Sequence, residues 1–142
     1  MKTKVNSFFL NDFISLNQQI NLSILEKKKV SLLIKREDLI HPFVSGNKFR
    51  KLKYNIEEAI KSSQKTLLTF GGAFSNHIVA TAVAANLVGL KSIGIIRGEE
   101  LGKNLKQTLE SNSTLKEANK NGMTFDFVSR ENYRNKSQES FI

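Results

Sequence analysis

One lysine stands where an amine could act as a nucleophile or as a base. Lys48 lies in the segment 45–52, and the apolar periodicity that follows predicts a helix with Lys48 in its first turn. An amine in Schiff-base chemistry must lose its proton, and a helix N-terminus with the cations Arg50 and Lys51 beside it favours the neutral form. The residues therefore allow such chemistry at Lys48. The alternative is one more solvated lysine at the basic start of a helix.

A second segment, residues 70–77, has the pattern of a loop that binds an anion. Gly71 and Gly72 follow an apolar run and predict a turn in which the backbone can approach a ligand closely. The free N–H groups of the helix that follows attract a carboxylate or a phosphate. Ser75 and Asn76 fit this function, but they also fit the alternative of plain helix N-cap residues.

Several other sites are excluded by spacing. The loop at residues 70–77 has neither the dinucleotide nor the P-loop pattern, and Asn76 and His77 follow Ser75 where a serine nucleophile elbow has x-Gly. His41 and His77 are too far apart for a metal signature and are simplest as a loop residue and an early helix residue. With no cysteine in the chain, we predict no metal site and no disulfide.

The surrounding pattern alternates short strands with helices, which predicts an α/β fold with a parallel sheet and helices on both faces. Ligands of such sheets bind at the carboxyl ends of the strands, where both loops lie. Asn47 is expected to cap the first long helix. The strands are expected at residues 30–35 (buried), 66–70, 92–96 and 124–128, and the helices at 47–62, 75–88, 104–120 and 130–142.

The amino-acid composition limits which partners and which location can be expected for this protein. The 142 residues carry a net charge of +9 from 22 basic and 13 acidic side chains, and most of the basic ones are lysines rather than the arginines that read bases. We therefore expect no nucleic-acid partner, although a basic α/β protein that binds an anionic ligand or nucleic acid without catalysis stays open as the alternative function. No stretch has the length of a membrane span or a signal peptide, and a cytoplasmic location is expected.

Taken together, the two loops carry a family resemblance. The sequences GNKFRKL (residues 46–52) and GGAFSNH (residues 71–77), with KRED upstream at 35–38, resemble the 1-aminocyclopropane-1-carboxylate deaminase and D-cysteine desulfhydrase family of pyridoxal-phosphate enzymes. The resemblance runs from about residue 30 to about residue 130. It implies the fold of the tryptophan-synthase-β-like pyridoxal-phosphate enzymes, and pyridoxal 5'-phosphate as the cofactor.

The resemblance also implies roles for five residues. Lys48 would bind the cofactor covalently and move the proton at the substrate carbon, with Asn47 steadying the lysine. Asn76 would contact the ring hydroxyl of the cofactor. Ser75 would lie over the reacting carbon, and the amides from Ser75 to His77 would hold the substrate carboxylate. The shared reaction is deamination of a small amino acid to a 2-oxo acid and ammonia, and a histidine at position 77 is more usual in the desulfhydrase branch.

Family members combine a large and a small α/β domain. By this resemblance, residues 1–50 are expected to form the N-terminal part of the large cofactor domain, and residues 51–142 an incomplete small domain. The chain would then be an N-terminal fragment that ends before the loop for the cofactor phosphate, and its own activity would be in doubt. A homodimer is expected for the intact enzyme. A further alternative is a non-catalytic remnant that folds only with a partner supplying the missing half.

Overall fold

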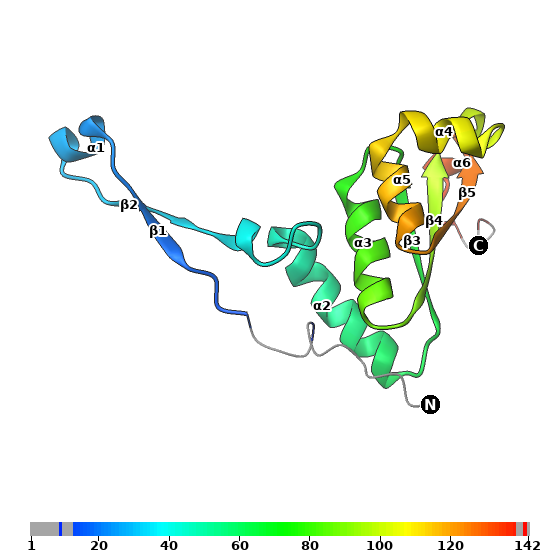
Figure 1. Ribbon diagram of the computed structural model, residues 1–142, viewed down its shortest axis with the longest axis horizontal. Helices are drawn as coiled ribbons and strands as arrows, with labels where there is room; N and C mark the ends of the chain where they lie inside the picture. The colour runs from blue at the N-terminus through cyan, green and yellow to red at the C-terminus, as the bar shows by residue number, and fades with distance from the viewer. Residues whose placement is uncertain (1–8, 10–12, 139–140, 142) are drawn as a thin grey trace.

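The computed structural model describes residues 9, 13–138 and 141 of the chain, and its body is a three-stranded parallel sheet. The strands are β3 (Thr66–Gly72), β4 (Lys91–Arg97) and β5 (Met123–Val128), hydrogen-bonded in the order β3-β4-β5 (Figure 1). The strands expected at 66–70, 92–96 and 124–128 are confirmed, as is the parallel pairing. Each observed strand is one or two residues longer than expected.

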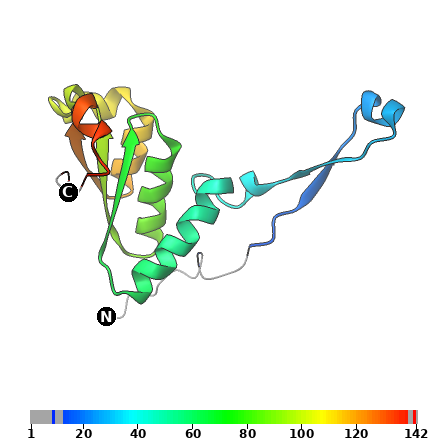
Figure 2. The same cartoon turned by 180° about the vertical axis from the view of Figure 1, so that it is seen from behind.

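Helices lie on both faces of this sheet, as the α/β pattern predicts. The helices α3 (Asn76–Leu87) and α5 (Ser113–Lys120) cover one face, and the short helix α6 (Arg130–Arg134) lies over the other (Figure 2). The longest helix, α2 (Gly46–Lys61), packs against α3. The remaining elements of the body are the 3-10 turns η2 (Glu37–Leu39) and η3 (Glu99–Gly102) and the helix α4 (Leu105–Ser111).

Helix α3 is buried on all sides, because a hydrophobic cluster packs against each of its flanks. Every residue from 78 to 85 is buried, and four of these eight are alanines that let neighbouring elements approach closely. On one flank, Val79 and Val83 meet α2 residues, including Phe49 and Ile56. On the other flank, α3 meets the sheet and α5 through a second cluster, which contains Ile78, Ala82, Ile96, Leu115 and Met123.

An arm formed by residues 17–35 projects from this body (Figure 1). Its strands β1 (Asn17–Ile20) and β2 (Leu32–Lys35) pair antiparallel, and the helix α1 (Ser23–Lys28) joins them. The strand expected at 30–35 is confirmed as β2, but its expected burial is wrong: all four residues of β2 are exposed, and Leu33 is 57% exposed. An apolar run shows that a segment can be buried, but it does not show which part of a protein would cover it.

Three helix predictions are also corrected. The single helix expected at 104–120 is two helices, because Asn112 has an extended backbone and its side chain caps α5 by accepting a hydrogen bond from the Leu115 amide at 2.9 Å. Asn47 does not cap α2, since the N-cap position belongs to Ser45 and Asn47 lies within the first turn. The helix expected at 130–142 ends at Arg134, and residues 139, 140 and 142 lie outside the described part of the chain.

The turn expected at Gly71 and Gly72 is displaced by two residues. Both glycines are the last residues of β3, where they lie opposite Ile96 and Arg97 of β4, and the turn follows at residues 73 and 74. A Cβ atom at Gly71 would come within 2.6 Å of Cγ1 of the buried Ile78, so only glycine lets α3 lie this close to the strand.

Among the described residues, no helix has the length and apolar character needed to cross a membrane. The division into a cofactor domain at 1–50 and a smaller domain at 51–142 stays a prediction.

The contact at Gly71 predicts different effects for two adjacent substitutions. Gly71→Ala should lower the free energy of unfolding by about 1–3 kcal/mol, because its Cβ overlaps a packed side chain in the core. Gly72→Ala is the matched control, since its Cβ would meet only Arg97 Nη2, at 3.9 Å. Urea unfolding of both variants measures the difference. Equal destabilisation by the two substitutions would contradict the close approach of α3.

Candidate functional site

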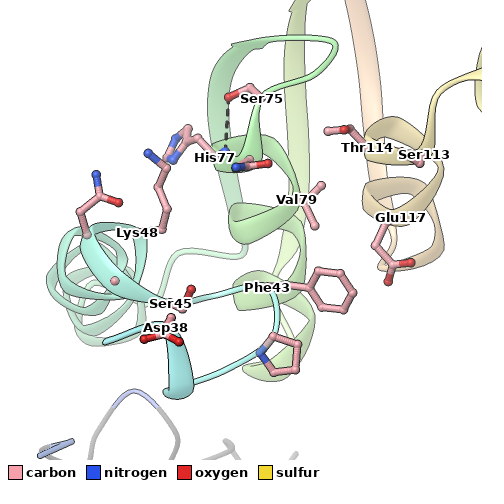
Figure 3. A pocket seen from close by; sticks show the side chains of 14 residues that line it. Asp38, Phe43, Ser45, Lys48, Ser75, His77, Val79, Ser113, Thr114 and Glu117 are labelled. Carbon is pink, nitrogen blue, oxygen red and sulfur yellow. Dashed lines mark hydrogen bonds between the residues drawn. The ribbon is translucent and has the colours of Figure 1, made fainter. Parts of the chain in front are cut away.

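A cavity of about 840 Å³ lies where three helices begin (Figure 3). Residues 45–48 at the start of α2 form one wall, and residues 75–77 at the start of α3 form the second. Ser113, Thr114 and Glu117 of α5 form the third. The volume is within the usual range for sites of small molecules and cofactors, which is roughly 300–1,000 Å³.

All five residues that the sequence singled out line this one cavity. They come from the two predicted loops, which the fold brings together although more than twenty residues separate them in the chain. They are Asn47, Lys48, Ser75, Asn76 and His77. Their chemical roles stay predictions.

The wall supplied by α5 was not predicted. Sequence reasoning treated residues 104–120 as one helix, which leaves no helix end near the cavity. The signal that would have revealed it is Asn112 followed by Ser113 and Thr114, because asparagine is among the preferred N-cap residues. The cavity therefore has three helix N-termini on its walls, and the positive ends of their dipoles favour an anionic ligand.

The start of α3 carries a local hydrogen bond that fixes the backbone beside the cavity. The Ser75 hydroxyl accepts a hydrogen bond from the backbone N–H of His77 at 3.3 Å, which makes Ser75 the N-cap of α3. The alternative of Ser75 as an N-cap residue is thus confirmed, while Asn76 lies within the first turn. Ser75 also lines the cavity, and the cap leaves the Asn76 backbone N–H, which has no hydrogen bond to a described residue, as a donor for a ligand.

Lys48 and His77 point toward one another from α2 and α3 (Figure 3). The His77 ring is half-buried, and its Nε2 lies 2.8 Å from the Thr69 hydroxyl on β3. Burial lowers the pKa of His77 below its usual range, and the positive charges of Lys48 and Lys51 lower this pKa further. His77 is therefore neutral at pH 7.

The loop before α2 is held by two polar networks. His41 accepts hydrogen bonds at Nδ1 from the backbone N–H groups of Phe43 and Val44, each at 3.1 Å, so its role is structural. Glu37 accepts from Arg50 Nε at 2.8 Å and Nη2 at 2.7 Å, and from the Ser15 hydroxyl at 2.5 Å.

The Arg50–Glu37 pair changes one expectation about the lysine. Arg50 was expected to act on Lys48 as a neighbouring cation, but its guanidinium is bidentate to the Glu37 carboxylate, which offsets that charge. The hydrogen bonds from Arg50 and Ser15 lower the pKa of Glu37 to about 2. The pair joins η2 to the first turns of α2, and so it fixes the wall that carries Lys48.

Two carboxylates also line the cavity, and each already has a partner. Asp38 forms an ion pair with Arg36 at 2.7 Å, and Glu117 Oε1 accepts a hydrogen bond from the Asn121 side chain at 3.0 Å. Within the part of the chain that the structure describes, no three His, Asp or Glu residues are grouped as metal ligands.

Comparison with curated proteins finds relatives over about half of the chain. A bifunctional D-cysteine desulfhydrase/1-aminocyclopropane-1-carboxylate deaminase of Arabidopsis thaliana is 44% identical over 70 residues, which are 49% of this chain and 18% of the relative. A 1-aminocyclopropane-1-carboxylate deaminase of Mesorhizobium japonicum is 44% identical over 66 residues (46% and 20%). A D-cysteine desulfhydrase of Salmonella paratyphi B is 35% identical over 65 residues (46% and 20%).

A solved structure described as an ACC deaminase homologue shares the fold, with a TM-score of 0.54 at 22% identity. The match covers 92% of this chain and 48% of that one, so the chain spans about half the length of this structural relative. No family model matches the chain. The matches confirm the resemblance and the α/β fold, and the matched segments span about a fifth of each curated relative.

The depressed pKa of Glu37 predicts a specific dependence of stability on pH. Because the folded pKa of about 2 is below the ordinary value of 4.5, the stabilisation is complete above pH 4.5 and is lost as the pH falls toward 2. Glu37→Gln should remove this part of the slope when the unfolding midpoint is measured from pH 6 to pH 2. Glu58→Gln, an exposed change on α2, is the control. An unchanged slope in Glu37→Gln would contradict the pairing.

Proposed function

We propose that this chain, a relative of 1-aminocyclopropane-1-carboxylate deaminases and D-cysteine desulfhydrases, supplies the lysine side of a pyridoxal-phosphate site for the deamination of a small amino acid. The observation that supports this most directly is that Lys48, Ser75, Asn76 and His77 line one cavity. The relatives are named as enzymes for this chemistry. We propose the same class of activity for this protein.

The residues of the cavity fit the proposed cofactor. Pyridoxal phosphate carries an aldehyde, a ring hydroxyl and a phosphate, and these call for an amine, a polar neighbour and an anion-binding surface. Lys48 offers the amine and the Asn76 amide offers the polar neighbour, with Asn47 beside the lysine on the same helix turn. The helix N-termini on the walls offer peptide N–H groups to anionic groups.

The proposed chemistry divides between the cofactor and the chain. Bound pyridoxal phosphate supplies an electron sink that stabilises negative charge at the substrate carbon. Where the α-carbon carries a hydrogen, as in D-cysteine, Lys48 Nζ would accept that proton. The α-carbon of 1-aminocyclopropane-1-carboxylate carries none, and with that substrate Lys48 would move protons at the ring carbons. The backbone N–H of Asn76, which has no hydrogen bond to a described residue, would hold the substrate carboxylate at the positive end of α3, and the Ser75 hydroxyl would carry protons at the reacting carbon.

The proposed substrate class rests on the names of the relatives, and the size and polarity of the site are compatible with it. The ligand must carry a carboxylate for the start of α3, and it must be small enough to share the cavity with the cofactor. We therefore propose a small amino acid of the D-cysteine or 1-aminocyclopropane-1-carboxylate type, which reacts with water to give a 2-oxo acid and ammonia, together with sulfide when the substrate is D-cysteine. Ser113 and Thr114 of α5 line the same cavity, and we propose that they contact the substrate.

The proposal is tested by mapping where the cofactor attaches. The 142-residue chain is mixed with pyridoxal phosphate and reduced with borohydride, and the modified lysine is identified by peptide mass spectrometry. Most of the label should reside on Lys48. The label should persist at high salt, because a covalent bond does not depend on ionic strength, whereas binding through several phosphate contacts does.

Two variants control this measurement. Lys48→Ala should remove the specific label, whereas Lys51→Ala should leave it unchanged, because Lys51 is exposed on the next turn of α2 and does not line the cavity. Label scattered over many lysines, with no difference between the two variants, would contradict the proposal. Binding that disappears as salt is raised would favour the alternative of a basic protein for polyanions.

A further inference from the structure

His77 has two ring nitrogens in different surroundings. Nε2 lies 2.8 Å from the Thr69 hydroxyl oxygen, whereas no hydrogen bond joins Nδ1 to any of the described residues. His77 lines the cavity, and Nδ1 is the ring nitrogen without a hydrogen-bond partner among the described residues, so Nδ1 is the nitrogen available to a ligand. Whether Nδ1 donates or accepts a hydrogen bond depends on which nitrogen carries the proton of the neutral imidazole.

The surroundings of Thr69 indicate which nitrogen of the neutral His77 ring carries the proton. Thr69 lies on β3 and is only 7% exposed, and its hydroxyl has His77 Nε2 as its single hydrogen-bond partner among the described residues. If Nε2–H donated to Thr69, the hydroxyl hydrogen would be buried without an acceptor, which is costly. If Thr69 donates to a bare Nε2, every buried hydrogen has a partner, and the ring proton is on Nδ1.

We infer that Thr69 is a positioning residue that holds His77 in the Nδ1–H tautomer, so that His77 presents a hydrogen-bond donor to the cavity. The bond from Thr69 fixes the ring orientation and the tautomer together. The lowered pKa of His77 is consistent with this arrangement, because burial and the nearby lysine charges keep the ring neutral and keep Nε2 free to accept.

The Nδ1–H donor of His77 favours ligand groups that accept hydrogen bonds. A carboxylate has only acceptors, so it gains a hydrogen bond from Nδ1–H, whereas it would face the lone pair of a bare Nδ1 without one. His77 would thus add a side-chain donor to the backbone N–H groups at the start of α3. That this anion is the carboxylate of an amino-acid substrate rests on the proposed function; the tautomer itself does not.

The second histidine of the chain provides an internal reference. His41 Nδ1 accepts two backbone hydrogen bonds, so the proton of its neutral ring is on Nε2. The two histidines should therefore be opposite tautomers in one spectrum. Long-range ¹H–¹⁵N correlation spectra of the 142-residue chain at pH 7.5 distinguish bare from protonated ring nitrogens, and His77→Gln assigns the two sets of signals.

Two variants of Thr69 test its role. In Thr69→Val, which keeps the shape and removes the hydroxyl, the ratio of Nδ1–H to Nε2–H at His77 should fall by about tenfold or more, while His41 is unchanged. Thr69→Ser should restore the native ratio. The borohydride label at Lys48 should persist in Thr69→Val, so a failure of the tautomer inference and a failure of the cofactor proposal give different results.

Three results would overturn the inference. They are an Nε2–H tautomer for His77 in the native chain, an unchanged ratio in Thr69→Val, and loss of the native ratio in Thr69→Ser. The first is read from the native chain alone, so it decides the matter even if Thr69→Val does not fold.

Discussion

The burial of α3 between two hydrophobic clusters is the constraint on which the rest of the structure depends. A helix that is apolar on every side must be covered on every side. Here α2 covers one flank, and the sheet with α5 covers the other. Small residues along α3 and the missing side chain at Gly71 allow the close packing that this requires. The position of α3 then fixes where α2 and α5 begin.

The cavity is a consequence of that packing. Because α2 and α5 both lie against α3, their N-termini meet the N-terminus of α3 on one side of the molecule. Two separate sets of hydrogen bonds hold the side chains around the cavity. Glu37 and Arg50 hold the wall that carries Lys48, and Thr69 holds the His77 ring. Positive helix ends and an amine around one space favour a ligand with anionic groups, and this links the fold to the proposed cofactor.

Much of the fold and of the site could be predicted because the relevant patterns are local. Periodicity predicted three strands and the helices α2 and α3, and the family resemblance of the two loops singled out the five residues at the cavity. The features that could not be predicted depend on contacts between segments that are distant in the chain. The exposure of β2 depends on what lies against the arm, and the pairing of Arg50 depends on Glu37, 13 residues away. The break at Asn112 was local but hidden by continuous helical periodicity on both sides.

We propose that the helix N-termini around Lys48 form one binding site for pyridoxal phosphate. The most direct measurement is the ¹H–¹⁵N amide spectrum of the chain during addition of that cofactor. We predict that the amide signals that move most belong to residues 46–48, 75–77 and 113–114, which lie in different segments of the sequence and line the same cavity. Shifts concentrated instead on the exposed lysines of the arm at residues 27–29, with the cavity amides unmoved, would contradict the account.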